Sequence, residues 1–431
     1  MIQQSESAYP PLFLSKPLDF LILSNGPGEI TSWVLPVVKA LRDKFGNNRD
    51  LVRISVILSP CPHASGKETA IARTFPEVDR VQSPEYFFTF LWRGQTQDNW
   101  DWYPQGMVIF LGGDQFYPLV IGSRLKYRTL VYAEWDARWL PWIDSFALGQ
   151  DSVQAKIPSK YHHKCRVVGN LMADLGEIYQ DDYSPSDQEI IGLLPGSKSA
   201  KLTQGVPLAV GIAEAIAQVR PATRFILPLA PTLDVKTLAR FAQKETNPFI
   251  AKINGITGEL KSDLGYYLQT PSGVKIELVT RFPVFDLLAQ CRLCLTTVGA
   301  NTAQLGTLAV PMLVLIPTHQ LDAMRSWDGI PGLLANLPGL GYYFARLINW
   351  AVIRQKRLYA WPNLWAKEAI VPELLGEIKA ESVASLVLEL LKHPEELQKM
   401  RDRLLQIRPQ SGAASRLVEM IEPFTDESSL Y

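Results

Sequence analysis

Residues 21–36 read LILSNGPGEITSWVLP and join a short apolar run to a helix-like pattern through a glycine-rich elbow. The apolar run has the length of a strand, and the apolar residues after the elbow recur at helical spacing. Gly26 and Gly28 allow other atoms to approach the backbone closely. The stretch therefore predicts a buried strand that turns directly into a helix, and the elbow is either a ligand-binding loop or only a tight turn.

The same pattern recurs along the whole chain. Short, nearly continuous apolar runs rich in Leu, Ile and Val alternate with longer helical patterns, which is typical of parallel strands covered by helices. We therefore predict an α/β protein built from two doubly wound parallel sheets. The runs lie at residues 19–26, 52–59, 106–113, 128–134 and 165–170, and then at 189–197, 222–231, 274–280, 292–299 and 311–317.

The length of 431 residues suits two domains. The polar, turn-rich stretch 176–189 has no apolar period and marks the boundary between them. We expect an N-terminal domain at 17–180, a second domain at 187–395, and a helical segment at 396–431 that packs back across the domains. Residues 248–273 are interrupted by glycines and aromatic residues of their own, which predicts a hairpin inserted in the second domain.

Composition narrows the classes of partner. The chain has 43 Lys and Arg against 43 Asp and Glu, so no overall field favours nucleic acid, and a small-molecule or lipid substrate is expected. Four cysteines are too few for a disulfide framework, which favours a cytoplasmic location. The first residues lack a secretory signal, and no stretch offers about 18 uncharged apolar residues, so we expect no membrane-spanning segment.

Ligands of open parallel sheets bind beyond the carboxyl ends of the strands, so the strand-to-helix junctions are candidate sites. The elbow offers the hydroxyls of Thr31 and Ser32 but is no dinucleotide fingerprint, since Thr31 stands where a third glycine would be needed. Asp114 follows the strand at 106–113. Its carboxylate could take a proton from a substrate hydroxyl, or it could only cap the next helix.

Two junctions in the second half offer the parts of an anion site. In LPGSKSAK, backbone amides and a hydroxyl lie beside Lys198 and Lys201, without the full spacing of an ATPase phosphate loop. In VGANT, small residues enter a helix whose free amides could reach an anion. Each could be a simple turn, but together they predict a pocket for a nucleotide diphosphate. The candidate residues are Gly196, Ser197, Lys198, Gly299, Asn301 and Thr302.

We expect no metal site. Cys291 and Cys294 lack a second ligand pair and are expected in the core, the five histidines form no helix-spaced pair, and no D-x-D triplet is present. Residues 330–365 mix Leu and aromatic side chains with basic ones. This segment either contacts an anionic membrane peripherally or forms a buried inter-domain helix.

Several motifs resemble, in order and rough spacing, the lipid-A-disaccharide synthase family. They are LPGSK, VGNLMADL, VGANTAQLGTLAVPMLV and WPNLWAKEAIVPELL, and residues 28–32 stand where that family has GEASGD. The resemblance implies a glycosyltransferase of GT-B architecture, with two Rossmann-like domains facing a cleft. The C-terminal domain would hold a UDP-sugar and the N-terminal domain a lipid or glycolipid acceptor. Such enzymes invert the anomeric centre and use no metal or other cofactor.

The resemblance also implies roles for individual residues. Asp114 matches the general base, Lys198 stands for an arginine near the diphosphate, and Gln304 stands for a glutamate of the nucleotide loop. Asn363 and Glu373 match the asparagine of the PN motif and the glutamate of the PE motif. The implied acceptor-side loop is Gly28, Glu29, Thr31 and Ser32, and the implied nucleotide-sugar contacts are Gly196, Ser197, Lys198, Gly299, Asn301, Thr302, Gln304, Asn363 and Glu373.

Three departures from the family pattern indicate a different substrate. Trp33 replaces an acidic residue and adds bulk, Lys198 lacks the bidentate fork of an arginine, and Gln304 lacks a charge. Two further readings therefore stay open. One is a nucleotide-sugar 2-epimerase-like enzyme, and the other is a non-catalytic regulator of the same fold that binds nucleotide or lipid.

Overall fold

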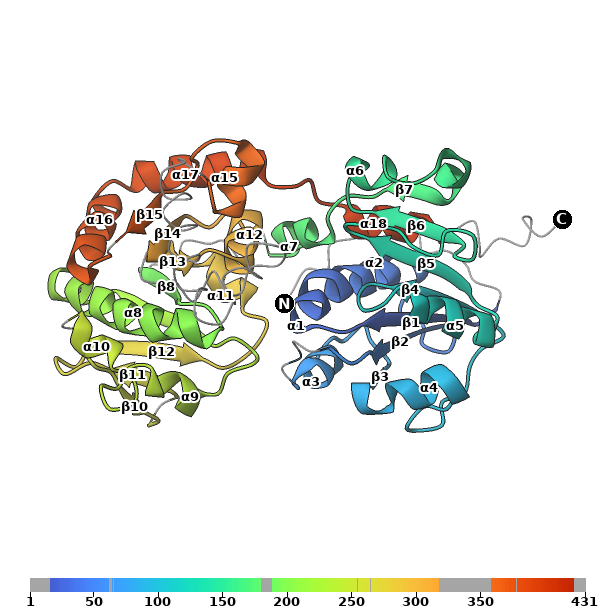
Figure 1. Cartoon of the computed structure of the whole chain (residues 1–431), viewed down its shortest axis with the longest axis horizontal. Coiled ribbons are helices and arrows are strands. Elements are labelled where there is room, and N and C mark those ends of the chain that lie inside the picture. Colours follow the sequence, from blue (N-terminus) through green and yellow to red (C-terminus); the bar gives the residue numbers. More distant parts are fainter. Residues whose placement is uncertain are drawn as a thin grey trace, which may run out of the picture. The chain divides into compact units, whose positions relative to one another are not determined.

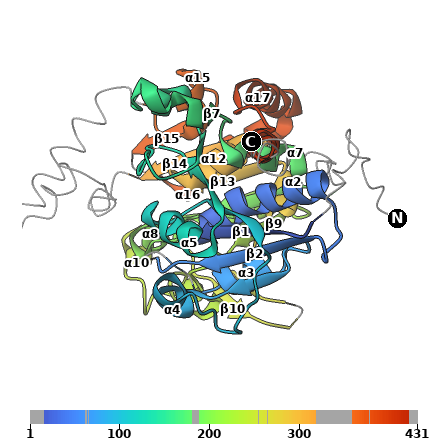
Figure 2. The same ribbon diagram turned by 90° about the vertical axis from the view of Figure 1, so that its right-hand side faces the viewer.

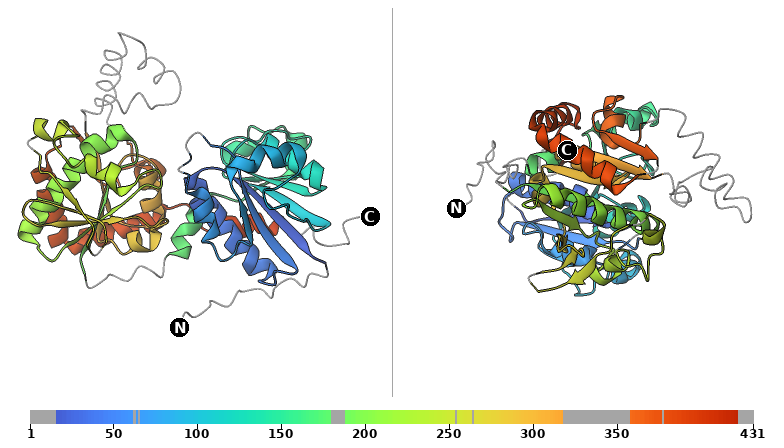
Figure 3. Two further views of the ribbon diagram at one scale, coloured as in Figure 1. Left: turned by 90° about the horizontal axis from the view of Figure 1, so that it is seen from below. Right: turned by 90° about the vertical axis from the view of Figure 1, so that its left-hand side faces the viewer.

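A computed structural model describes residues 16–421 except 62, 63, 65, 180–187, 254, 264, 318–357 and 377. The chain divides into two compact units (Figure 1). Unit 1 holds the described residues up to Ile178 together with those from Pro409 onward, and unit 2 runs from Tyr179 to Arg408. Each unit is a single sheet with helices on both faces (Figure 3).

Unit 1 is built on a seven-stranded parallel sheet in the order β3-β2-β1-β4-β5-β6-β7. Leu18 of β1 lies opposite Val52 on one side and Gln105 on the other, so the chain winds away from β1 in both directions. The sheet therefore has its topological switch point between β1 and β4. The strands are β1 (Leu18–Ser24), β2 (Val52–Leu58), β3 (Arg80–Gln82), β4 (Gln105–Phe110), β5 (Arg128–Ala133), β6 (Ser145–Leu148) and β7 (Cys165–Val167).

The helices of unit 1 follow the strands as the sequence pattern predicts. The first begins at Pro27 and is continuous through α1 (Pro27–Glu29), a π-helical turn η1 (Ile30–Val34) and α2 (Leu35–Phe45). Figure 2 shows α2 beside β1 and β2. The others are α3 (Glu68–Arg73), α4 (Phe87–Arg93), α5 (Phe116–Leu125), α6 (Asp151–Gln154), α7 (Asp174–Ile178) and α18 (Ala413–Glu419), with short 3-10 turns at Pro84–Tyr86, Ser159–Lys164 and Leu171–Ala173.

Unit 2 has an eight-stranded sheet in the order β10-β11-β12-β9-β8-β13-β14-β15, with its switch point between β8 and β13. Strands β10 and β11 are antiparallel and extend the sheet from β12, which confirms the predicted hairpin insertion. The strands are β8 (Ile190–Leu194), β9 (Arg224–Pro228), β10 (Glu259–Lys261), β11 (Tyr267–Gln269), β12 (Lys275–Val279), β13 (Leu293–Thr297), β14 (Met312–Pro317) and β15 (Glu373–Gly376).

The helices of unit 2 include one that is long and apolar enough to span a membrane, among the residues that the structure describes. This helix, α8, has 67% of its most apolar window buried, as a core helix does, so it is weak evidence for a membrane span. The helices are α8 (Ser199–Val219), α9 (Val235–Arg240), α10 (Phe249–Lys252), α11 (Phe285–Ala289), α12 (Ala300–Thr307), α15 (Trp361–Ala366), α16 (Ala380–Lys392) and α17 (Pro394–Ile407).

The C-terminal segment at 396–431 is divided between the units, since α17 belongs to unit 2 and α18 to unit 1. Asp174 fixes α18 by accepting hydrogen bonds from the backbone amides of Gly412 (2.7 Å), Ala413 (3.1 Å) and Ala414 (2.7 Å). The carboxylate thus satisfies amides at the start of the helix that would otherwise be unpaired. Residues separated by more than 230 positions are joined by this one side chain.

Replacing Asp174 with Ala should release α18 from unit 1. Because backbone amides would lose their acceptor inside the protein, we expect a cost of about 1–3 kcal/mol. Hydrogen exchange of the peptide over 412–419 measures it, and Asp174→Asn, which keeps one acceptor oxygen, should lose less protection. Unchanged exchange in the Ala variant would contradict this role.

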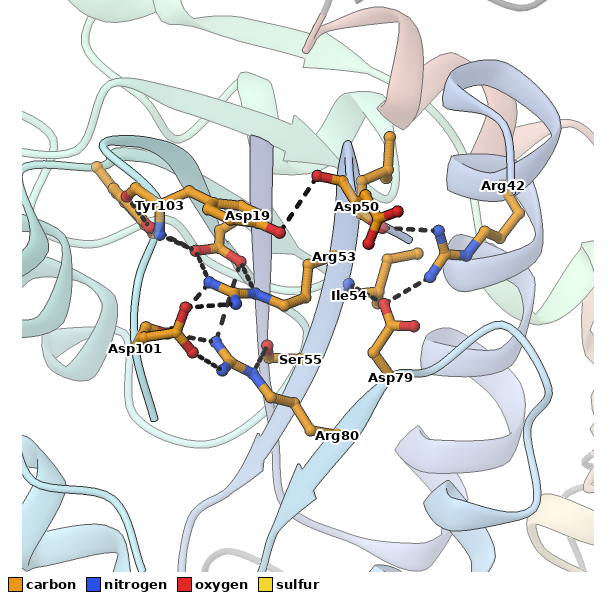
Figure 4. A network of polar contacts seen from close by, with 12 residues as sticks. Asp19, Arg42, Asp50, Arg53, Ile54, Ser55, Asp79, Arg80, Asp101 and Tyr103 are labelled. Carbon is orange, nitrogen blue, oxygen red and sulfur yellow. Dashed lines mark hydrogen bonds and ion pairs between the residues drawn. The ribbon is translucent and has the colours of Figure 1, made fainter. Parts of the chain in front are cut away.

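A buried network of charged side chains lies at the amino end of the unit 1 strands (Figure 4). Asp19 of β1 is fully buried and accepts two hydrogen bonds from Arg53 of β2, at 2.6 and 2.8 Å. Asp19 also accepts from the backbone amide of Tyr103 (2.6 Å) and from the Tyr127 hydroxyl (2.8 Å). The network ties the first two strands to the loop before β4 and to the start of β5.

Candidate functional site

The switch point of unit 2 brings two predicted junctions together. Strands β8 and β13 are direct neighbours, and each leads through a short loop into a helix, α8 or α12. Both helices therefore present their amino-terminal ends at the same edge of the sheet. Unpaired amides and the positive ends of two helix dipoles suit this edge to an anionic group such as a diphosphate.

Two glycines shape this edge. Gly196 has φ +99° and Gly299 has φ +142°, a region that side chains rarely allow. A Cβ on Gly196 would lie 3.0 Å from Lys201 Cδ and 3.3 Å from Thr297 Oγ1. Gly196 is therefore needed for the close packing of the two loops, and Gly299 for its backbone conformation.

Lys201 joins the two loops directly. Its ammonium donates a hydrogen bond of 2.6 Å to the carbonyl of Val298, just before Gly299. Burial lowers the pKa of Lys201, and the positive charge of Lys198 lowers it further. An anion between the two loops would offset both effects. From the sequence we selected the exposed Lys198 as the site residue and not Lys201, which lies beside it. The position of Lys201 in the first turn of α8 could have identified it.

The predicted site residues of α12 differ in how far they are exposed. Asn301 and Gln304 are partly exposed and lie one helical turn apart, and their contact with a ligand stays a prediction. Thr302 is fully buried, donates to the carbonyl of Gly299 (2.8 Å) and accepts from the amide of Trp361 (3.2 Å). The Thr302 hydroxyl thus holds the loop, and contact of Thr302 with a nucleotide stays a prediction.

Asn363 and Glu373 form an internal network. Asn363 is fully buried, donates to the Val371 carbonyl (2.9 Å) and to Glu373 (2.8 Å), and accepts from the amides of Ile370 and Val371. Its amide group is thus bonded within the protein, and contact of Asn363 with a nucleotide stays a prediction. Glu373 also accepts from the backbone amides of Tyr359 and Ala360, so it orders the segment before α15.

The elbow forms the corresponding edge of unit 1, after β1 at the switch point. The hydroxyls of Thr31 and Ser32 are buried and donate to the carbonyl of Gly28, at 3.2 and 2.6 Å. Both hydroxyls therefore bond within the helix, and their contact with an acceptor stays a prediction. Gly28 is exposed and Glu29 is partly exposed, so both remain available. The π-helical turn that follows is a feature found often at functional sites.

Close packing and unpaired polar atoms mark this edge. A Cβ on Gly112, after β4, would lie 2.9 Å from Asn25 Oδ1 and 3.4 Å from Glu29 Cγ. Of the seven buried side-chain polar atoms without a hydrogen-bond partner in the described residues, three belong to residues in or near this edge, namely Ser24 Oγ, Ser59 Oγ and Trp33 Nε1. Such atoms are rare in folded proteins, and a ligand that pairs with them would explain their presence. Trp33 packs edge to face against Tyr132, with ring centroids 5.4 Å apart.

Asp114 and Glu134 are the carboxylates that follow β4 and β5. Asp114 is exposed and accepts a hydrogen bond of 2.9 Å from the amide of Phe116, so the capping contact considered from the sequence is present. Glu134 is partly buried, and the sequence patterns did not select it. Burial raises the pKa of Glu134, and the charge of Glu29 raises it further.

Two further predictions concern the segment 330–365 and the cysteines Cys291 and Cys294. The segment 330–365 lies outside the described residues up to 357, so its membrane contact remains a prediction. Cys291 and Cys294 are buried and free, in agreement with a core position. In the part of the chain that the structure describes, no group of three or more His, Cys, Asp or Glu residues could hold a metal ion.

Two Rossmann-like units, each with a polar edge at its switch point, define a GT-B architecture. A crystal structure of a UDP-N-acetylglucosamine 2-epimerase shares this fold, with a TM-score of 0.51 and 13% identity over 95% of this chain and 96% of that chain. At this level of identity the likeness concerns the fold alone. The predicted fold class is confirmed.

The chain is a distant relative of the lipid-A-disaccharide synthases. It is 22% identical over 286 residues to that enzyme of Trichlorobacter lovleyi, covering 64% of this chain and 60% of the relative. It is 25% identical over 228 residues to that of Nitrosococcus oceani, covering 52% and 45%. The chain thus spans about half the length of the curated relatives it matches. No family model matches the chain.

Proposed function

We propose that the protein is a glycosyltransferase that moves a sugar from a UDP-sugar to a hydroxyl acceptor with inversion and without a metal. The observation that carries the proposal is the edge of unit 2 where two helix amino termini meet beside Lys201. This arrangement suits the diphosphate of a nucleotide sugar. The choice of UDP rests on the resemblance to the lipid-A-disaccharide synthases.

Sugar transfer needs positive charge near the departing diphosphate, and this edge of unit 2 carries it. When the bond between the sugar and the diphosphate breaks, negative charge grows on the departing phosphate oxygens. Lys201 is fixed by Val298, and Lys198 is exposed nearby on the same loop, so both cations could offset that charge. Helix dipoles that already point at the site need no reorganisation during the reaction.

The acceptor would lie on the polar edge of unit 1, where Glu29, Asp114 and Glu134 gather after neighbouring strands. A lipid-linked or glycolipid acceptor is proposed because the relatives are lipid-A-disaccharide synthases. Action on such an acceptor would place the protein at the cytoplasmic face of a membrane as a peripheral protein. The substitutions at Trp33, Lys198 and Gln304 favour an acceptor or sugar other than those of the relatives.

Titration calorimetry with UDP tests the donor half of the proposal. The full chain should bind UDP at one site, and Lys198→Ala should weaken binding several-fold, since an exposed charge pair contributes about 0.2–1 kcal/mol. Glu389→Gln, on the exposed face of α16, is the matched control and should leave binding unchanged. A chain that binds no uridine nucleotide would refute the proposal.

A 2-epimerase-like activity is the second candidate, favoured by the three carboxylates on the edge of unit 1. Incubating the full chain with UDP-N-acetylglucosamine alone and following the sugar by proton NMR distinguishes the two. Formation of the 2-epimer without any acceptor would support the epimerase. A regulator without catalysis would bind UDP but neither transfer nor epimerise the sugar.

A further inference from the structure

The connection between β5 and β6 carries three exposed tryptophans. Its residues 134–144, here called the Trp loop, are all described and form no helix. Trp135, Trp139 and Trp142 are 58%, 37% and 62% exposed. Tryptophan is well buried on average, and several exposed apolar side chains close together mark an interaction surface. We propose that the Trp loop docks unit 1 on an anionic lipid bilayer, an inference that rests on the proposed action on a lipid-linked acceptor.

The inner side of the Trp loop is fixed to the sheet of unit 1. Ile143 is fully buried, and Leu140 packs against the same core. Gln115 holds the loop twice, since its side-chain amide donates to the carbonyl of Asp136 (2.9 Å) and its Oε1 accepts from the amide of Arg138 (2.7 Å). The exposed tryptophans are therefore presented by a backbone that is anchored to the core.

The backbone is strained at the centre of the loop. Trp139 has φ +58°, a left-handed conformation that is unusual for a bulky side chain. Such strain persists only where the surroundings hold it, and it is frequent at functional sites. Here the Trp139 carbonyl accepts from the amides of Trp142 (2.9 Å) and Ile143 (3.1 Å). The Trp139 ring lies 5.4 Å from that of Phe116 and 5.9 Å from that of Trp142, so the three rings form one aromatic surface.

Two lysines give this surface positive charge. Lys156 donates a hydrogen bond of 3.3 Å to the carbonyl of Trp135. Lys164 donates one of 2.8 Å to the carbonyl of Ile143. Among the residues that the structure describes, neither ammonium forms an ion pair with a carboxylate. Two positive charges without a compensating anion therefore lie against the Trp loop.

The carboxylates of the loop oppose an anionic surface only weakly. The loop contains three acidic residues, and two of them are paired. Asp136 pairs with Arg138 at 2.7 Å, and Asp144 pairs with Arg128 at 3.4 Å. The third, Glu134, is partly buried. The lysines beside the loop are thus not cancelled by its own charges.

Tryptophan together with lysine favours a bilayer as the partner. Tryptophan is enriched at the membrane interface, where its ring lies beside apolar chains and its N–H group reaches the polar headgroups. Lysines next to the bilayer attract its anionic headgroups. The Trp loop combines both types of side chain on a single surface of unit 1. It does so independently of residues 330–365, for which membrane contact is a separate prediction.

The Trp loop also borders the proposed acceptor edge of unit 1. It begins directly after β5, which pairs with β4, and the helix that carries Phe116 follows Asp114. Docking through this loop would therefore hold the acceptor edge near the bilayer. A lipid-linked acceptor could then present its hydroxyl while its acyl chains stay in the membrane.

Flotation of the full chain with lipid vesicles tests this surface. The chain should float with vesicles of equal parts phosphatidylglycerol and phosphatidylcholine, and much less with pure phosphatidylcholine. Replacing Trp135 and Trp142 together by Ser should weaken binding about 10- to 100-fold, because two side chains lose their burial in the interface. Both are exposed, so the circular dichroism should not change. Tyr266→Ser, at an exposed aromatic residue of unit 2, is the matched control and should bind as the wild type does.

Lys156→Gln tests the electrostatic part. It should weaken binding to the anionic vesicles about fivefold, the effect of one cation near an anionic surface, and leave the weak binding to pure phosphatidylcholine unchanged. Vesicles with brominated acyl chains provide a direct readout of insertion. They should quench the tryptophan emission of the wild-type chain more strongly than that of the double Trp135 and Trp142 variant. Equal quenching would contradict insertion of the Trp loop.

The outcomes separate this surface from the transferase proposal. Equal flotation of the double variant and the wild type would overturn the docking surface. If the wild-type chain bound no vesicles and the double variant dissociated a dimer in sedimentation, the partner would be a second copy of the chain and not a bilayer. A chain that binds UDP but no vesicles would remove only this inference. Vesicle binding through the Trp loop without UDP binding would support the surface and refute the transferase proposal alone.

Discussion

Lys201→Met is expected to weaken UDP binding by about 10- to 100-fold. The ammonium of Lys201 is the group that joins the loops after β8 and β13, through its hydrogen bond to Val298. A hydrogen bond to a charged group contributes about 1.5–3 kcal/mol. This variant would lose the proposed bond to the diphosphate together with the link between the loops. Titration calorimetry with UDP on the full chain measures the change in Kd.

Lys198→Met is the matched comparison, because it removes the same charge from an exposed position just before α8. Its effect on Kd should be clearly smaller than that of Lys201→Met. The wild-type affinity should also decline as pH rises through the lowered pKa of Lys201, earlier than for an ordinary lysine, because the ammonium is then lost. Equal effects of the two variants would contradict the assigned role of Lys201.

The fold was largely predictable because each long central strand is a nearly continuous apolar run. Strand β1 is buried along its whole length, and both halves repeat this pattern. The strands that the sequence did not reveal are short or lie toward the edges of the sheets. Strands β3 and β15, for example, have three and four residues, and at least one residue of each is partly exposed. Such segments have too few apolar residues to show a period.

The loops that carry the site were also predictable, but most side-chain directions were not. Glycine-rich junctions after parallel strands identify the carboxyl edge of a sheet without knowledge of neighbouring strands. Whether a hydroxyl faces a ligand or its own helix depends on its rotamer, and Thr31, Ser32 and Thr302 all bond to nearby carbonyls. The partial burial of Glu134 likewise depends on the fold and could not be read from its local sequence.

Asp19→Ala is expected to destabilise unit 1 by about 3–5 kcal/mol, the usual cost of breaking a buried ion pair. Asp19 is fully buried, and its removal takes the carboxylate acceptor from the Tyr103 amide and leaves Arg53 with the exposed Asp101 as its partner. The Tyr127 hydroxyl keeps its hydrogen bond to the Tyr103 carbonyl. Burial opposes the charge of Arg53, yet hydrogen bonds to Asp19 and Asp101 keep its pKa above the usual value. Hydrogen exchange of peptides covering β1 and β2 measures the loss for unit 1 alone.

Asp101→Ala supplies the control within the same network. Asp101 pairs with Arg53 at 2.9 Å and with Arg80 at 3.5 Å, but its side chain is 78% exposed. Because water replaces an exposed partner easily, its loss should cost no more than about 1 kcal/mol. Similar protection in the two variants would show that the strand starts do not depend on the buried carboxylate. A large difference would show that the amino end of the sheet is stabilised by Asp19, independently of the polar edge where the chemistry is proposed.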